Sequence, residues 1–320
     1  MTRATPALFG FAALILWGGL GCSEVEDVSP AETTARVIAG GSFNCLLSTK
    51  GHVWCEDYER AEAREIANEM DTEGVFTKVL AGGYAACGLT EKKKVHCWGN
   101  PSSDIIADEP SGEFEELYAD LWGACAVDAS GSSTCWSMEP DGEIPAGSGV
   151  IPSSIVGAHS SSLCGLDATG TIHCWGKNGT GSSAPTGVFT DLRAGTMGFA
   201  ARAQDGSWRW WGRNSLGEGD IPTDIEIIDL AFGSYHGCAL DPDGKVHCWG
   251  AIDPDGEEPY RWQLDVPEDE TFVSIDANLW HTCGVTTEGD VRCWGCNTWL
   301  FPDYWDPEDH CNDPNPPWDQ

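Results

Sequence analysis

The chain has 320 residues and is strongly acidic, with 51 Asp and Glu against 17 Lys and Arg and a formal net charge of -34. Its 15 Cys and 16 Trp both exceed ordinary usage. This charge excludes a nucleic-acid-binding role, because the chain offers no basic patch that could release counterions from phosphates.

Residues 1–22 are predicted to be a processing segment that does not join the fold. A basic start at Arg3 precedes the apolar run "PALFGFAALILWGGL" at 6–20, which has signal-peptide length and is short for a membrane span. The next residues, "GLGCS", resemble a bacterial lipoprotein box, in which Cys22 would be acylated and become the mature N-terminus. A conventional cleaved signal is the alternative. Ser23 after the cysteine favours retention at the outer membrane, and residues 23–36 are expected to form a disordered acidic tether.

Cysteine pairs recur along residues 37–298, and in each pair the second Cys stands ten positions after the first. The six pairs are Cys45 and Cys55, Cys87 and Cys97, Cys125 and Cys135, Cys164 and Cys174, Cys238 and Cys248, and Cys283 and Cys293. The units recur about every 36 to 45 residues, a period that is typical of a repeat architecture.

A seventh unit lies in the long gap between Cys164 and Cys238. The stretch "FTDLRAGTMGFAARAQDGSWRWWGRN" at 189–214 keeps the same frame, with Ala200 and Trp210 where the two cysteines would stand. Both cysteines are missing together, as expected if the two sulfurs of one unit bond to each other. Six disulfides within repeats are therefore predicted. Beyond Cys22, this leaves two further cysteines to pair near the C-terminus: Cys296 and Cys311.

The two cysteines of each pair are expected to stand opposite each other on the two strands of an antiparallel hairpin. This arrangement leaves a three-residue loop between the strands. Six of the seven loops end in Gly, where such a loop needs a left-handed residue. The exception is Glu91-Lys92-Lys93. Bridges of this kind require an oxidising compartment, in agreement with the signal segment.

The stretches "LAFGSYHGCALDPDGKVHCWG", "DANLWHTCGVTTEGDVRCWGCN" and "WGRNSLGEG" resemble the bacterial Cys-containing branch of the regulator of chromosome condensation repeat family. Members of that family form seven-bladed β-propellers. The resemblance implies an all-β, seven-bladed β-propeller over 37–298, with disulfide-stapled hairpins in six of seven repeats and room for a fourth, outer strand between units. Residues 299–320 are expected to be a Pro- and Asp-rich tail pinned by the last disulfide. The nuclear founder of the family exchanges guanine nucleotide and binds chromatin, a role that the charge of this chain rejects.

In six of the seven units, the loop before the first Cys position carries Phe, Tyr, Trp or, in the cysteine-free unit, Met197, and equivalent loops of a propeller emerge on one face. A ring of aromatic side chains there would suit a binding partner. The alternative is that these rings fold down over the blade core. The candidate binding residues are Phe43, Tyr84, Trp122, Tyr235, His236, Trp280 and His281.

Other candidate chemistry has simpler explanations. The histidines of the "HCWG" segments and those before the first Cys of a unit, His159, His236 and His281, are interpreted, like the Trp-Gly tryptophans, as repeat positions that pack between blades or cap loops. No pair shows zinc-ligand spacing with a third ligand. The segments 241–244 and 253–256 ("DPDG") lack the remainder of a calcium loop. No Gly-x-Ser-x-Gly elbow occurs. No catalytic residue, metal or cofactor is predicted.

The leading hypothesis is a lipid-anchored β-propeller of the bacterial cell envelope, an outer-membrane lipoprotein or a secreted protein, that binds other proteins and catalyses nothing. Its acidic surface favours a basic protein partner, and a monomer that meets the membrane only through its lipid is expected. Two alternatives remain: a hydrolase or lyase with an acidic, calcium-dependent pocket, and a passive structural envelope protein.

Overall fold

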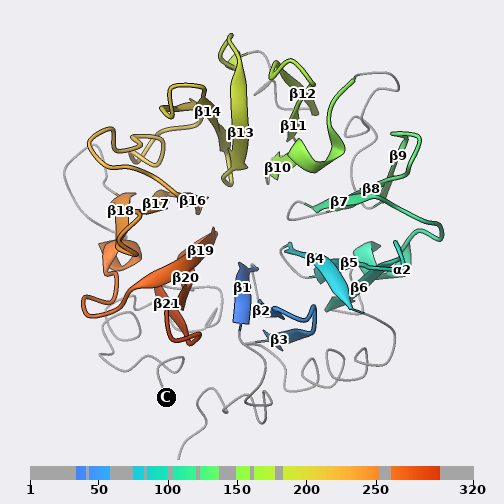
Figure 1. The fold of residues 1–320 in the computed structure, drawn as a ribbon, viewed down its shortest axis with the longest axis horizontal. Coiled ribbons are helices and arrows are strands. Elements are labelled where there is room, and N and C mark those ends of the chain that lie inside the picture. The colour runs from blue at the N-terminus through green and yellow to red at the C-terminus, as the bar shows by residue number, and fades with distance from the viewer. Residues whose placement is uncertain are drawn as a thin grey trace, which may run out of the picture.

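A computed structural model describes residues 34–40, 43–57, 75–82, 85–99, 104–119, 123–136, 149–158, 162–176, 183–251 and 261–295. These residues form seven three-stranded antiparallel sheets, each made of three strands that are consecutive in the chain. The sheets stand around a central axis as the blades of a propeller (Figure 1). None of the described helices is long and apolar enough to span a membrane.

We number the blades in chain order. The strands of blades 1 to 3 are β1 (Thr34–Ala39), β2 (Phe43–Ser48), β3 (Val53–Asp57), β4 (Phe76–Ala81), β5 (Ala85–Thr90), β6 (Val95–Gly99), β7 (Glu116–Ala119), β8 (Ala124–Val127) and β9 (Ser133–Trp136). Those of blades 4 and 5 are β10 (Val156–Ala158), β11 (Ser162–Leu166), β12 (Ile172–Gly176), β13 (Phe189–Ala194), β14 (Gly198–Ala203) and β15 (Trp208–Gly212). Blades 6 and 7 comprise β16 (Asp229–Phe232), β17 (His236–Leu240), β18 (Val246–Gly250), β19 (Phe272–Asn278), β20 (His281–Thr286) and β21 (Val291–Gly295). The helical segments are α2 (Asp104–Ala107), η3 (Pro152–Ser154) and η5 (Arg261–Leu264).

The middle and outer strands of every blade are joined by the three-residue loop that the sequence predicts. In blade 1, the N–H of Ser48 donates to the carbonyl of His52, 2.8 Å away, which closes the loop 49–51. The last loop residue is a glycine in the left-handed region in six blades, for example Gly51 with a φ of 81°. In blade 2 Lys93 takes this place, with a φ of 61°.

The six predicted disulfides within repeats are confirmed. In each, the two cysteines are direct cross-strand partners, as Cys238 and Cys248 are, and the Cα–Cα distances are 4.0 to 4.1 Å. In blade 5, Ala200 pairs with Trp210 in the same register. Cys22, Cys296 and Cys311 lie outside the described residues.

The apolar core lies between neighbouring blades. One cluster, for instance, joins Cys238 and Leu240 of blade 6 to Phe272 and Trp294 of blade 7. The Trp-Gly tryptophans serve this core, as predicted: Trp98, Trp211 and Trp294 are each only 5% exposed. Since a single blade has both faces covered by its neighbours, the ring must close for the end blades to be buried.

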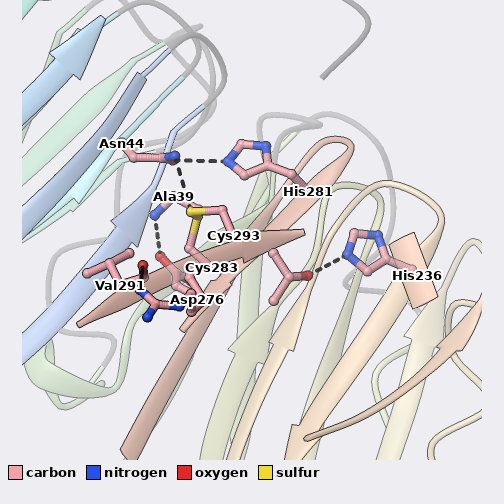
Figure 2. The surroundings of a disulfide bond; sticks show 10 residues. Ala39, Asn44, His236, Asp276, His281, Cys283, Val291 and Cys293 are labelled. Atoms are coloured by element: carbon pink, nitrogen blue, oxygen red, sulfur yellow. Dashed lines mark hydrogen bonds between the residues drawn. A yellow bond between two sulfur atoms is a disulfide. The ribbon is translucent and has the colours of Figure 1, made fainter. Parts of the chain in front are cut away.

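The ring closes directly between blade 7 and blade 1, which lie side by side (Figure 1). Val37 of β1 packs against Cys283 and Val285 of β20. Polar contacts complete this seam. The N–H of Ala39 donates to Oδ2 of Asp276 at 2.9 Å (Figure 2). Nδ2 of Asn278 donates to the carbonyl of Ala39 at 2.9 Å. Each described blade has three strands, so the room for a fourth strand is not used within the described residues.

Candidate binding surface

The strand connections define two opposite faces of the propeller. The turn face holds the connections between inner and middle strands, described at 40, 82, 123, 195–197, 233–235 and 279–280. The hairpin face holds the connections between middle and outer strands. Tight turns keep the first connections short: the N–H of Gly195 donates to the carbonyl of Gly198 at 2.8 Å, and the N–H of Gly233 to the carbonyl of His236 at 3.0 Å.

The candidate aromatic residues can be followed in only part of the ring. Tyr235 and Trp280 lie on the turn face, each partly exposed. Met197, in the corresponding turn of blade 5, is 38% exposed. Tyr84, Trp122 and the side chain of Phe43 lie outside the described part of the chain, so those three predictions stay untested.

Tyr235 and Trp280 contact each other across two blades, and Arg213 of a third blade covers the tyrosine. The two ring centroids are 4.9 Å apart with the planes tilted by 42°. The guanidinium carbon of Arg213 lies 4.7 Å from the centroid of Tyr235. This arrangement is a cation–π contact continued by an aromatic pair. We call Arg213, Tyr235 and Trp280 the stack.

Arg213 is fixed in place by its own backbone and by a buried carboxylate. Its N–H donates to the carbonyl of Met197 at 2.9 Å, and its Nε donates to Oε1 of Glu218 at 3.0 Å, where Glu218 is only 2% exposed. Gly212 allows this turn: its φ is 117°, and a Cβ there would lie 2.5 Å from the Cα of Gly198. The repeat pattern could not indicate Arg213, because the residue after Trp-Gly differs from unit to unit.

His236 and His281 do not present a contact surface, although they directly follow the aromatic residues of the turn face. They are 0% and 6% exposed. Nε2 of His236 lies 2.8 Å from Oγ1 of Thr282, and Nε2 of His281 lies 3.0 Å from Oδ1 of Asn44 (Figure 2). Both histidines therefore link one blade to the next. They are not part of the candidate contact surface. The alternation of a β-strand explains this, because neighbouring residues point to opposite sides.

Burial governs the protonation of these two histidines. It lowers the pKa of His236 to about 3, with the nearby His281 as the second cause, and lowers the pKa of His281 to about 4. Both imidazoles are thus neutral at physiological pH. A neutral ring can donate one hydrogen bond across each seam without a buried charge.

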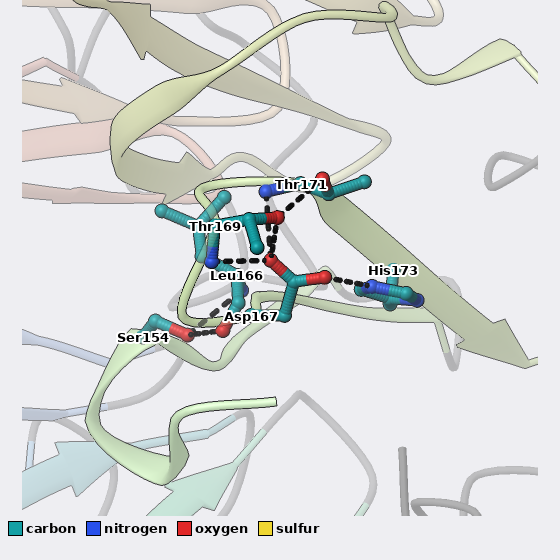
Figure 3. A network of polar contacts seen from close by, with 6 residues as sticks. All are labelled: Ser154, Leu166, Asp167, Thr169, Thr171 and His173. Carbon is teal, nitrogen blue, oxygen red and sulfur yellow. Dashed lines mark hydrogen bonds and ion pairs between the residues drawn. The ribbon is translucent and has the colours of Figure 1, made fainter. Parts of the chain in front are cut away.

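Two of the three "HCWG" histidines, His173 and His247, cap the hairpins, in line with the simpler interpretation, whereas Nδ1 of His96 lies 3.7 Å from Oε1 of Glu109. In blade 4, Oδ1 of Asp167 accepts the N–H groups of Thr169 and Thr171 at 2.8 and 3.1 Å, and Oδ2 contacts Nε2 of His173 at 2.8 Å (Figure 3). Asp241 and His247 repeat this contact in blade 6, also at 2.8 Å.

These turns explain the first of the two calcium-like segments. Oδ1 of Asp241 accepts the N–H groups of Asp243 and Lys245 at 2.9 Å, so its lone pairs serve the turn. The second segment, 253–256, lies outside the described residues. Within the ranges that are described, no group of three or more His, Cys, Asp or Glu side chains could hold a metal ion.

Carboxylates around the axis satisfy the free edges of the inner strands. Oδ1 of Asp191 accepts the N–H of Leu192 at 2.8 Å, and Oδ1 of Asp229 accepts the N–H of Leu230 at 3.0 Å. Arg193 is shared between these two carboxylates, at 2.8 and 3.6 Å. Such groups protect sheet edges, and their oxygen atoms already accept these hydrogen bonds.

Asp276 is the axial carboxylate with a raised pKa. Its removal from water between β19 and β1 raises the pKa to about 6, and the Asp229 charge adds to this rise. The Arg36 guanidinium and the N–H groups of Ala39 and Ala277 act in the opposite direction. The carboxyl group contacts the β1 backbone, so we assign it to the seam.

Comparison with known proteins agrees with this architecture. Residues 227–253 and 272–298 match the family profile of the regulator of chromosome condensation (RCC1) repeat. The structure is similar to the ectodomain of the receptor kinase CR4 from Physcomitrella patens, with a TM-score of 0.66 at 22% identity over 82% of this chain and 74% of the other. It is also similar to the ACR4 ectodomain from Arabidopsis thaliana (TM-score 0.59, 18% identity, 83% of this chain and 96% of the other). A third similar structure is Prp20p from Saccharomyces cerevisiae (TM-score 0.56, 15% identity, 81% of each chain).

Proposed function

We propose that this chain, a member of the RCC1-repeat family with a seven-bladed fold, is a protein-binding module of the bacterial cell envelope. The observation that carries the proposal is the stack of Arg213, Tyr235 and Trp280 on the turn face. Tyr, Trp and Arg dominate the energetically important positions of protein interfaces. The stack lies across three blades, is partly exposed, and is anchored by a buried Glu218, so it offers a preorganised contact surface.

Known relatives support a protein partner. Prp20p, which shares the fold, binds Gsp1p and histones. Nucleic acid is an unsuitable ligand for a chain with a net charge of -34. We expect a monomeric propeller and a partner with a basic surface, because the acidic charge would accelerate such an encounter.

The cysteines and the N-terminal sequence support an extracytoplasmic compartment. Six disulfides need an oxidising environment. We propose that residues 1–22 direct export, that Cys22 is acylated, and that residues 23–36 tether the propeller to the outer membrane. A Cys22→Ser variant should then move from the membrane fraction to the soluble fraction and lose the acyl mass. A variant that stays in the membrane fraction would contradict the lipid anchor.

The binding surface can be tested by photo-crosslinking of the full chain in its native envelope. A benzoylphenylalanine at Met197, beside the stack, should give a discrete adduct with a partner protein. The same group at Lys92, an exposed hairpin residue of blade 2, is the control and should not give that adduct. A Tyr235→Ala/Trp280→Ala background should abolish the Met197 adduct while all disulfides remain formed. An adduct that persists in this background, or no adduct in the parent, would overturn the assignment of the stack.

A further inference from the structure

Large apolar side chains that remain exposed gather on the hairpin face, opposite the stack. The described residues include five exposed large apolar side chains, and only Met197 lies on the turn face. The other four belong to four successive blades: Ile151 at 42%, Val188 at 47%, Ile228 at 52% and Val273 at 54% exposed. Single exposed apolar residues are ordinary, whereas four in succession on one face suggest an interaction site.

Three of these residues occupy the same structural position in their blades. The N–H of Ile151 donates to the carbonyl of Leu166 at 2.8 Å, and the N–H of Ile228 donates to the carbonyl of Leu240 at 2.9 Å. Each acceptor stands two residues after the first Cys of its blade. Val273 lies at the register shift that separates Phe272 from Ser274. A bulge of this kind turns a side chain away from the sheet.

The fold does not require an aliphatic residue at this position. Blades 2 and 5 place Thr77 and Thr190 at the equivalent register shifts, and both side chains are exposed. Their hydroxyls donate to the carbonyls of Leu89 and Arg202 at 3.1 and 3.3 Å. Threonine at this position therefore makes an extra hydrogen bond from its hydroxyl to a backbone carbonyl. Isoleucine and valine there forgo this bond and leave apolar surface in water, which points to a role outside folding.

Val188 extends the same surface in blade 5, where Thr190 takes the bulge. It directly precedes Phe189, whose N–H donates to the carbonyl of Gly170 at 2.8 Å. This contact places Val188 against the hairpin tip of blade 4. The apolar side chains thus lie among the hairpin tips, whose charges decide what can approach them.

The hairpin face is electrically divided. The tip of blade 2 carries three consecutive lysines, Lys92 to Lys94, of which Lys93 and Lys94 pair with Glu115 and Glu113. The tips of blades 3 to 7 carry mostly acidic side chains, Asp128, Asp167, Asp205, Asp241, Asp243, Glu288 and Asp290, with Lys245 as a basic residue at the tip of blade 6. Hydrogen bonds from turn side chains and N–H groups lower the pKa of Asp128, Asp167 and Asp205, so these carboxylates stay charged. The exposed aliphatic residues lie in the acidic sector.

We propose that Ile151, Val188, Ile228 and Val273, with the acidic tips around them, form a second docking surface for a cationic amphipathic segment of a protein partner. Its apolar side chains would contact the four aliphatic residues, and its Lys or Arg side chains would face the acidic tips. A second copy of this chain does not fit, because two strongly acidic faces repel each other. Together with the stack on the opposite face, this surface would let one propeller hold two proteins at once.

A synthetic amphipathic peptide of Lys and Leu, labelled with fluorescein, is a direct probe, read by fluorescence anisotropy with the full oxidised chain. The variant Ile151→Thr/Ile228→Thr/Val273→Thr uses the residue that blades 2 and 5 already carry, so the fold is kept. We expect it to weaken binding at least about tenfold. Met197→Thr replaces the exposed large apolar side chain that is described on the turn face, and it should leave the affinity unchanged.

Two further arms make the proposal specific. Thr190→Ile adds an aliphatic residue within the same arc and should tighten binding. A Lys and Ser peptide, which keeps the charge alone, should bind at least about tenfold more weakly than the Lys and Leu peptide. Equal binding of the two peptides, equal affinity of the triple Thr variant, no binding by the parent, or dimerisation of the parent through these residues would each overturn the proposal.

Discussion

At the scale of single residues, the loop of blade 2 shows that glycine at the last loop position lowers the free energy of the fold but is not required for it. Lys93 adopts the left-handed conformation that glycine takes in the other six loops, at a cost of roughly 1–2 kcal/mol. Its ion pair with Glu115 joins two half-exposed side chains and offsets little of this cost.

We therefore expect Lys93→Gly to raise the free energy of unfolding by up to about 1 kcal/mol. Gly131→Lys is the matched reverse change, because a Cβ at Gly131 meets nothing within 4 Å and only the φ of 81° opposes it. That variant should lose about 1 kcal/mol. Guanidinium unfolding of the oxidised proteins measures both changes. A gain in the second variant, or a loss in the first, would contradict the conformational explanation.

The cysteine-free unit shows which kinds of residue the repeat pattern can predict. Ala200 and Trp210 replace a disulfide in register, and the pattern predicted this because the repeat fixes both partners. Arg213 was not predictable by this route, because its importance arises from a neighbour in the next blade. His236 and His281 stand next to the candidate loop residues, but they are buried and bond to the next blade, which agrees with the packing interpretation of these histidines and not with a contact role. Loop position alone does not reveal which side of the strand a residue faces.

At the scale of elements, the seam between blade 7 and blade 1 carries a pH-dependent contribution to stability. The pKa of Asp276 is raised to about 6 from an ordinary value of 3.8. The folded state thus holds this proton more tightly than the unfolded chain. The contribution is fully present in acid and is lost as the pH rises through about 4 to 6.

Asp276→Asn should remove this dependence, because the amide keeps an oxygen acceptor for the N–H of Ala39 and cannot ionise. Relative to this variant, the parent should lose on the order of 2 kcal/mol of unfolding free energy between about pH 4 and pH 7. Urea unfolding at several pH values gives the difference curve. A flat difference, or one with the opposite slope, would show that the carboxyl is not held away from water at the seam.

At the scale of the whole molecule, the sequence predicted the fold well because each unit repeats the same local instructions. Cysteine spacing, hairpin glycines and Trp-Gly positions are local features, and seven copies reinforce one another. Ring closure was not predictable, because it depends on contacts between opposite ends of the chain: Asp276 and Asn278 bond to Ala39, and His281 bonds to Asn44. The charge division of the hairpin face was not predicted from the sequence for the same reason. It appears only when tips distant in sequence are brought onto one face.

The two buried histidines make the ring sensitive to acid at consecutive seams. His236 of blade 6 contacts Thr282 of blade 7, and His281 of blade 7 contacts Asn44 of blade 1. In the unfolded chain each imidazole takes up a proton near its ordinary pKa of 6.5, whereas the folded pKa values are about 3 and about 4. The stability that depends on neutral imidazoles is therefore present above about pH 6.5 and is lost as the pH falls toward 4.

We expect the parent to lose about 2–3 kcal/mol of unfolding free energy per histidine between about pH 7 and pH 4.5, relative to His236→Gln/His281→Gln. Glutamine places an amide nitrogen near the site of Nε2 and so keeps a donor for Asn44 without a titrating group. The opposing contribution of Asp276 is common to both proteins and cancels in the difference. Denaturant unfolding at the two pH values measures it, and proton uptake on unfolding, followed by calorimetry in two buffers, gives an independent value. If the parent and the double variant respond equally to acid, the seams are not held by neutral histidines, and the acid sensitivity of the ring must come from other groups.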